Sequence, residues 1–261
     1  MTILLHELRR NRISLAVWTG IISFMLAITA MIYPEMKSQM GEMTDMFANM
    51  GDFTAAFGMD KLNFGEFMGY FGVECGNVLG LGGGFFAALA GIAALAGEEK
   101  ERTAEFLLTH PVSRRRIITE KLLSVIVQIT VLNIAVAVVS SLSILAIGEE
   151  VEAGKIALVF LAYYLMQLEI GAITFAVSAF IKGGGLGIGL GAAFGFYFIN
   201  IFSNLMDELE FLKFITPYGY TDVGYIVNEY SLDVKYLATG LVFIAASVIL
   251  AYYKYEKKDI S

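Results

Sequence analysis

Residues 97–121 read GEEKERTAEFLLTHPVSRRRIITEK, and they form the most charged segment of a very apolar chain. A long apolar run lies on each side of this stretch. Gly97 is a typical end for the helix that precedes it. Pro111 disfavours helical geometry at the residue before it, so a short helix inside the stretch would end at His110. The pattern predicts a short helix that lies on a membrane surface between two membrane-spanning helices.

The second half of the stretch predicts the start of another helix. Ser113 is a suitable N-cap, and Arg114, Arg115 and Arg116 follow it in the first turn. Three arginines oppose the dipole at a helix N-terminus, so the energetics of the helix alone do not explain them. Loops at the cytoplasmic face of a membrane collect Lys and Arg, which makes a membrane flank the simplest explanation.

This stretch resembles the loop between the second and third spans of ABC-2 type transporter permeases. The shared pattern is an acidic pair, a basic residue, a Thr, a Leu-Leu pair, Pro-x-Ser-Arg and a Lys that opens the third span. The matching residues are Glu98, Glu99, Arg102, Thr103, Leu107, Leu108, Pro111, Ser113, Arg114 and Lys121. The resemblance implies that the loop is a coupling helix, which docks into a groove of a separate ATPase subunit. The residues expected at that contact are Glu98, Glu99, Arg102, Thr103, Phe106, Leu107, His110, Pro111, Ser113 and Arg114.

Composition places the chain among membrane proteins. Hydrophobic residues make up 57% of it and charged residues 16%, and the mean hydropathy is +0.68. The net charge of -7 argues against a nucleic-acid partner, and one Cys with two His leaves little for a metal site. No Gly-Lys-Ser/Thr sequence is present to bind a nucleotide. We therefore expect no enzyme activity and no cofactor in this chain, with ATP and Mg held by the partner ATPase.

Hydropathy predicts an all-α polytopic protein with one domain over residues 1–261. Each apolar run is long enough to cross about 30 Å of hydrocarbon. The predicted spans are residues 13–33, 70–96, 122–147, 156–181, 184–202 and 236–253. Residues 1–12 predict a short interfacial helix, and the apolar run after them is too long for the alternative of a signal peptide. The resemblance implies a helical hairpin in the outer leaflet between the fifth and sixth spans, where Tyr218, Tyr220, Tyr225 and Tyr230 suit an interface.

The distribution of basic residues predicts the orientation. With six spans and both termini inside, thirteen of the eighteen Lys and Arg lie on the inner side. The other five are Lys37, Lys61, Lys155, Lys213 and Lys235. The positive-inside rule thus places both termini in the cytoplasm of a plasma-membrane protein.

Glycines recur every four residues in two of the spans. Small residues at this spacing allow close contact between membrane helices, within one subunit or across a dimer. The resemblance implies that the first and fifth spans line a dimer interface, so we expect a second permease copy, most simply an identical one. The two strips are Gly72, Gly76, Gly80, Gly84 and Gly183, Gly187, Gly191, Gly195.

Glu169 lies near the middle of the fourth span, where an ionised carboxylate costs at least about 2.5 kcal/mol. One hypothesis is that Glu169, with Gln167, Gln128 and Asn133, lines the translocation path. The alternative is a structural hydrogen bond from Glu169 to Gln128, Asn133 or a Tyr. Glu74 lies nearer the outer boundary, where the cost is smaller.

The function that these features favour is half of an exporter, driven by separate ATPase subunits through alternating access. Small permeases of this kind resemble exporters of amphipathic peptides, such as bacteriocins or phenol-soluble modulins, or of hydrophobic drugs. A copper-maturation permease is a second hypothesis because Met36, Met40, Met43, Met46 and Met50 recur at helical spacing, although this spacing also suits a helix on the bilayer surface. A third hypothesis is a mechanotransmitting or sensory module that moves no substrate, and a fourth is an ATP-independent channel or secondary transporter.

Overall fold

The computed structural model describes residues 2–48, 51–56, 62–63, 65–100, 112–181 and 183–257. Within these ranges every regular element is helical, and six helical segments are long and apolar enough to cross a membrane. These segments correspond to the six predicted spans, so the prediction of an all-α polytopic protein is confirmed. They are Ile3–Lys37, Phe67–Gly97, Arg114–Ile147, Ala153–Phe180, Leu186–Leu205 and Val234–Lys257.

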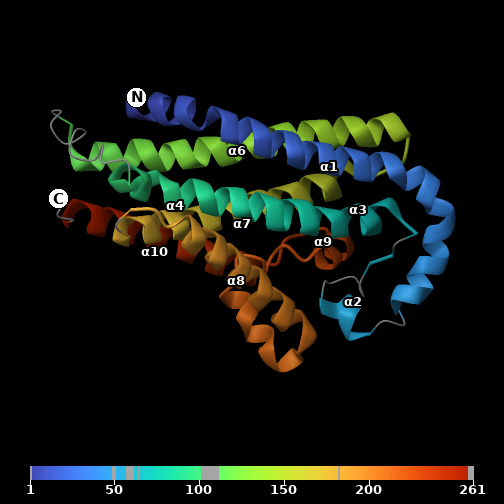
Figure 1. Cartoon of the computed structure of the whole chain (residues 1–261). Coiled ribbons are helices and arrows are strands. Elements are labelled where there is room, and N and C mark those ends of the chain that lie inside the picture. The colour runs from blue at the N-terminus through green and yellow to red at the C-terminus, as the bar shows by residue number, and fades with distance from the viewer. Residues whose placement is uncertain are drawn as a thin grey trace.

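The first span belongs to one long helix, α1 (Thr2–Ala48). The prediction of a separate interfacial helix over residues 1–12 is wrong, because α1 runs through this region into the span without a break. No Gly or Pro occurs before Gly20 to interrupt it. Pro34 lies inside the helix, and the blue ribbon in Figure 1 bends away from the bundle in its second half. The side chains of the methionine-rich residues 38–50 lie outside those that the structure describes.

The second span is made of three consecutive helical segments: α3 (Phe67–Cys75), the π-helix η1 (Gly76–Gly83) and α4 (Gly84–Lys100). The sequence of η1, GNVLGLGG, is half glycine, which weakens its preference for the α-helix. Side chains from other elements bind two carbonyl groups of η1. Gln167 Nε2 donates to Leu79 O over 3.3 Å, and Tyr218 Oη donates to Gly80 O over 2.9 Å. These contacts hold a wide and unusual turn in the middle of an apolar span.

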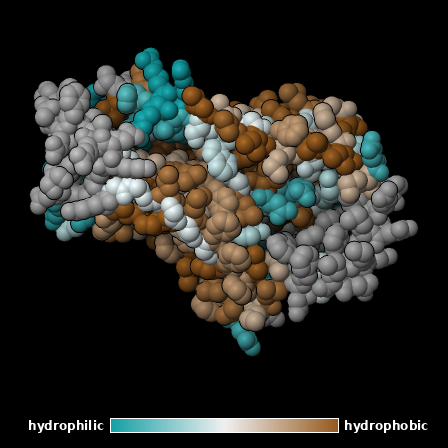
Figure 2. Space-filling view, in the orientation of Figure 1, coloured by the Kyte–Doolittle hydropathy of each residue, from teal (hydrophilic) through white to brown (hydrophobic). Residues whose placement is uncertain are grey.

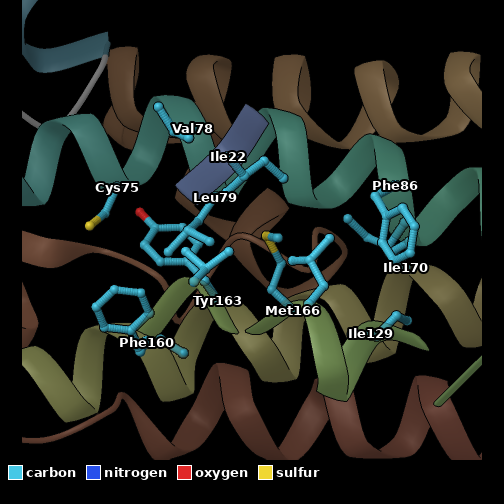
Figure 3. Packing of buried hydrophobic residues seen from close by; sticks show 14 of the residues in the cluster. Ile22, Cys75, Val78, Leu79, Phe86, Ile129, Phe160, Tyr163, Met166 and Ile170 are labelled. Atoms are coloured by element: carbon cyan, nitrogen blue, oxygen red, sulfur yellow. The ribbon is translucent and has the colours of Figure 1, made fainter. Parts of the chain in front are cut away.

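The bundle is organised around α7 (Ala153–Phe180), which packs against α4 on one side and α10 (Val234–Lys257) on the other. The first helix packs along α6 (Arg114–Ile147), and α8 (Leu186–Leu205) packs on α4 (Figure 1). Figure 3 shows Tyr163, Met166 and Ile170 of α7 close to Leu79 of η1 and Phe86 of α4. The second and fourth spans therefore supply much of the core, and α1 and α6 add buried side chains such as Leu26 and Ile129.

The surface of the bundle is suited to lipid. Large apolar side chains are exposed along α1, α6, α8 and α10, such as Phe24, Ile134, Phe198 and Val242. On the face seen in Figure 2, hydrophobic side chains cover the middle of the bundle and the projecting α8, whereas hydrophilic ones gather towards its two ends. A bilayer supplies the apolar environment that this surface needs.

Two short helices connect α8 to α10: the 3-10 helix η2 (Asp207–Phe214) and α9 (Val223–Glu229). The short α2 (Asp52–Ala56) lies against α8. The connection thus contains the predicted pair of short helices. Of its four tyrosines, Tyr225 and Tyr230 are exposed as an interface position requires, but Tyr218 and Tyr220 are buried. The prediction is wrong for these two because their hydroxyl groups find partners inside the protein.

Candidate coupling site

Both chain termini lie at the same end of the bundle, which we call the basic end (Figure 1). Here α4 ends at Lys100 and α6 begins at Arg114. The predicted contact residues between them, and the side chains of the acidic pair that begins the motif, lie outside those that the structure describes. They are Glu98, Glu99, Arg102, Thr103, Phe106, Leu107, His110 and Pro111.

The predicted helix end at Gly97 is wrong, because α4 continues through it to Lys100. A Cβ built on Gly97 would lie 3.0 Å from Nη2 of Arg10, so the guanidinium group of α1 packs directly over this glycine. A positive group near the C-terminal turn of a helix is favourable for its dipole. The tertiary contact therefore supports the last turn of α4 at a residue that would otherwise favour a helix end.

The start of α6 agrees with the prediction. Ser113 is extended and is the N-cap of α6, and its Oγ accepts a hydrogen bond from the amide of Arg116. Each arginine of the first turn has an internal partner. Arg114 Nη1 donates to the carbonyls of Tyr255 and Glu256, over 3.4 and 3.1 Å, at the end of α10.

The other two arginines pair with acids. Arg115 forms an ion pair with Glu256, and Arg116 Nε lies 2.9 Å from Glu120 Oε1. Glu120 Oε2 in turn accepts hydrogen bonds from the amides of Ile3 and Leu4, which stabilise the first turn of α1. The arginines that the sequence suggested for a membrane flank thus also tie α6 to α1 and α10.

A buried ion pair lies next to these contacts. Lys121 Nζ donates to Glu7 Oε1 over 2.9 Å and to the carbonyl of Ala94 over 2.7 Å. The two charged side chains are only 1% and 6% exposed. Arg10 Nη1 lies 3.9 Å from the same carboxylate oxygen. We call Glu7, Lys121 and the Ala94 carbonyl the buried clamp; it joins α1, α4 and α6 at one point.

Sequence reasoning missed the buried clamp, although both side chains carried a signal. Glu7 is the only acidic residue among the first 34, and it lies between basic residues. Lys121 belongs to the motif and is one of the thirteen basic residues that the positive-inside rule assigns to the inner side. No acidic residue lies three or four positions from Lys121 in the sequence, and a charge so close to a span needs a partner from another helix.

The four candidates for the translocation path do not form one cluster. Asn133 Nδ2 donates to Gln167 Oε1 over 2.7 Å, and Gln167 also binds the π-helix at Leu79 O. Gln128 donates to Ser124 O on its own helix. Glu169 is two residues beyond Gln167, so it lies on the opposite side of α7.

Glu169 is buried between α7, α10 and the connection before α9. Tyr220 Oη donates to Glu169 Oε2 over 2.8 Å. Burial raises the pKa of Tyr220, which keeps its hydroxyl group protonated as the donor. A Cβ built on Gly240 of α10 would overlap this carboxylate, so only glycine allows so close an approach. The geometry matches the structural alternative, a hydrogen bond to a tyrosine.

The two glycine strips differ in their surroundings. The first strip is Gly72, Gly76, Gly80 and Gly84. Cβ atoms built on these glycines would meet Val223, Tyr163 or Tyr218, so they serve packing inside the subunit. In the second strip, Gly187, Gly191 and Gly195 have no atom of the described chain within 4 Å of a built Cβ, and Gly183 has a positive φ of 68°.

Comparison with known proteins adds to this geometry. A search of curated proteins gives no match. The family model described as ABC-2 family transporter protein matches residues 1–260, which is nearly the whole chain. The six membrane-spanning segments and the motif at the basic end agree with this match. The chain therefore belongs to the ABC-2 transporter family and is an ABC-type permease subunit.

Proposed function

We propose that this permease is half of an ATP-driven exporter. Residues 101–113 would be the coupling segment through which separate ATPase subunits act on it, with a coupling helix that ends at His110. The observation that carries the proposal is the set of contacts on both sides of this segment. α4 ends at Lys100, six residues after Ala94, and α6 begins at Arg114, seven residues before Lys121. Ala94 and Lys121 meet in the buried clamp.

The contacts at the basic end explain how a push on one short segment would move several helices. Lys121 links α6 to α1 and α4, and Arg114 links α6 to the end of α10. Ion pairs shielded from water are stiff connections because their geometry is costly to break. Movement of residues 101–113 would therefore shift α1, α4, α6 and α10 together, as alternating access requires.

The charge distribution supports a cytoplasmic location for the basic end. Arg9, Arg12 and Lys254 join the arginines of α6 there, and the positive-inside rule assigns such an end to the cytoplasm. ATPase subunits bind on the side where ATP is present. Both termini would then be cytoplasmic, as predicted.

The open glycine face of α8 supports a homodimer. Gly187, Gly191 and Gly195 give α8 a smooth face that nothing in the described chain covers. A second copy would cover it with a close helix contact of the kind that small residues allow. A pathway between two permease subunits would carry the expected cargo, an amphipathic peptide or a hydrophobic drug.

The first test is purification from native membranes in mild detergent. We expect a stoichiometric ATPase subunit to accompany the permease, and to be lost when Phe106 and Leu107 are both changed to Asp. Phe211→Asp is the matched control, because this exposed apolar residue lies in the connection between α8 and α10. A permease that purifies alone, or a double variant that keeps the ATPase, would contradict the coupling-helix proposal.

The second test concerns transport. Inverted vesicles that contain the complex should accumulate an amphipathic peptide or a hydrophobic drug when ATP is supplied, and the same compound should stimulate ATP hydrolysis. ATPase activity that no such compound stimulates, without uptake, would favour the mechanotransmitting module. Uptake without ATP would favour a channel or a secondary transporter.

A further inference from the structure

A cavity of about 350 Å³ lies at the end of the bundle opposite the basic end. It is lined by Ala56 and Leu62, by the start of the second span, by α7, by α8 and by the connection that contains η2 and α9. Tyr163 lines it ten residues into α7, which is roughly 15 Å along that helix. The cavity therefore extends from the loops into the membrane-spanning part of the protein, and its volume is in the range of small-ligand sites, about 300–1,000 Å³.

Two of the charged groups that line this cavity have no charged partner within the described chain. Glu74 of α3 and Lys213 of η2 are both half-buried, and both line the cavity. Within the part of the chain that the structure describes, neither has an ion-pair or hydrogen-bond partner for its side chain, and they do not pair with each other. Asp222 also lines the cavity, but its carboxylate is the N-cap of α9 and accepts from the amide of Tyr225.

Unpaired charges at this position are costly, because the surrounding membrane and protein solvate them poorly. A simple cation in the cavity would pair with Glu74 and leave Lys213 unpaired. A simple anion would do the reverse, and an apolar ligand would leave both without a partner. A ligand that carries one charge of each sign satisfies both groups at once.

The rest of the lining suits such a ligand. Asn77 and Asn200 offer amide groups, and the ring of Tyr197 can receive an ammonium group on its face. Tyr197 and Tyr218 pack edge to face, with ring centroids 5.6 Å apart, so this wall is well fixed. Apolar side chains, including Ile201 and Val223, cover the remaining surface.

We propose that this cavity binds a phosphoethanolamine group, with the ammonium on Glu74 and the phosphate on Lys213. A lysine ammonium binds phosphate oxygens as a charge-assisted donor, and a carboxylate accepts from an ammonium in the same way. The group is available either as the headgroup of phosphatidylethanolamine in the bilayer or as a water-soluble compound. The site does not involve the coupling segment, so the result of its test is independent of the proposed function.

The test uses the purified, delipidated full chain in detergent and measures bound lipid by native mass spectrometry. The probes are phosphatidylethanolamine and phosphatidylglycerol with identical acyl chains, since the second lipid has the phosphate without the ammonium. We expect phosphatidylethanolamine to bind about tenfold more tightly, because one charge-assisted contact is gained. Glu74→Gln should abolish this preference, and Lys213→Gln should weaken the binding of both lipids.

Matched controls are Glu208→Gln and Lys235→Gln, which remove the same charges from exposed positions that do not line the cavity. Melting temperatures establish that the variants are folded. If Glu74→Gln does not fold, Lys213→Gln provides a second test. Competition by soluble phosphoethanolamine distinguishes the two sources. If it displaces bound phosphatidylethanolamine, the headgroup alone is recognised. If the soluble compound binds and the lipid does not, the site is assigned to the soluble compound. Equal binding of the two lipids together with no binding of phosphoethanolamine would overturn the proposal, as would a preference that survives Glu74→Gln.

Discussion

Replacing Lys121 by Met should destabilise the protein more than any other single change at the basic end. The lysine side chain is 1% exposed and its ammonium group contacts Glu7 and the Ala94 carbonyl over 2.9 and 2.7 Å. Removing one partner of a buried ion pair costs about 3–5 kcal/mol, because the remaining charge stays buried. Arg10 is 3.9 Å from the same carboxylate but partly exposed, so it offsets at most about 1 kcal/mol. We expect a net loss of about 3 kcal/mol in the free energy of unfolding.

The sole tryptophan offers a direct assay. Trp18 is on α1 and its ring packs near Phe86 of α4, with centroids 6.3 Å apart, so its fluorescence reports separation of α1 from the bundle. Unfolding in mixed micelles, followed at Trp18, should give the free energies of the wild type, Lys121→Met, Glu7→Leu and the double variant. Because an apolar pair of similar volume avoids buried charge, the double variant should recover most of the loss.

Two results would refute this reasoning. A loss below about 1 kcal/mol for Lys121→Met would mean that the pair is not shielded from water in the membrane protein. Additive losses in the double variant would mean that the two side chains do not interact. Arg115→Ala is the matched control, since its ion pair with Glu256 is largely exposed and screened by water, so its loss should change stability little.

Three further predictions concern the apolar part of the bundle. Gly83→Ala should lower the melting temperature, because a Cβ there would overlap the side-chain amide of Gln167 and overpacking costs about 1–3 kcal/mol. Tyr220→Phe should cost about 1–3 kcal/mol of stability in a thermal-unfolding assay, because buried Glu169 loses its donor. Gly191→Leu should leave the melting temperature of the monomer unchanged but reduce the dimer measured by light scattering in detergent, because its side chain would project from the open face of α8.

Each of these changes has a control in the same region. Gly82→Ala should be tolerated, since a Cβ there makes only ordinary contacts with Ile22 at 3.6 Å, and equal losses for Gly82 and Gly83 would contradict the packing argument. Tyr225→Phe removes an exposed hydroxyl group and should have little effect. Gly189→Leu should destabilise the fold itself, because a Cβ there would lie 2.8 Å from Ile92; a stable Gly189→Leu protein would show that α8 is not held against α4.

The sequence by itself determined the six spans, their order and the cap at Ser113. Backbone groups inside hydrocarbon must be satisfied within each segment, so an apolar run of sufficient length has to be a helix whatever its neighbours are. The cap at Ser113 depends only on residues within one helical turn, so the local sequence is enough to predict it. Both inferences rest on local chemistry.

Two predicted helix boundaries are wrong. The sequence suggested an end at Gly97 and a separate helix before Ile13, but the structure continues both helices. Arg10 packs over Gly97 and Glu120 binds the first amides of α1, and these contacts come from distant parts of the chain. Local propensities of about 1 kcal/mol are easily outweighed by such contacts.

Only the tertiary structure decided which residues meet. Glycine spacing showed that two helices each have a smooth face, but not that one face is covered within the chain and the other is open. The pairs Glu7–Lys121 and Glu169–Tyr220 join residues 114 and 51 positions apart. Helical periodicity fixes the side of a helix on which a residue lies, whereas the partner on that side depends on how the helices pack. The same packing created the cavity between Glu74 and Lys213, which no local pattern could reveal.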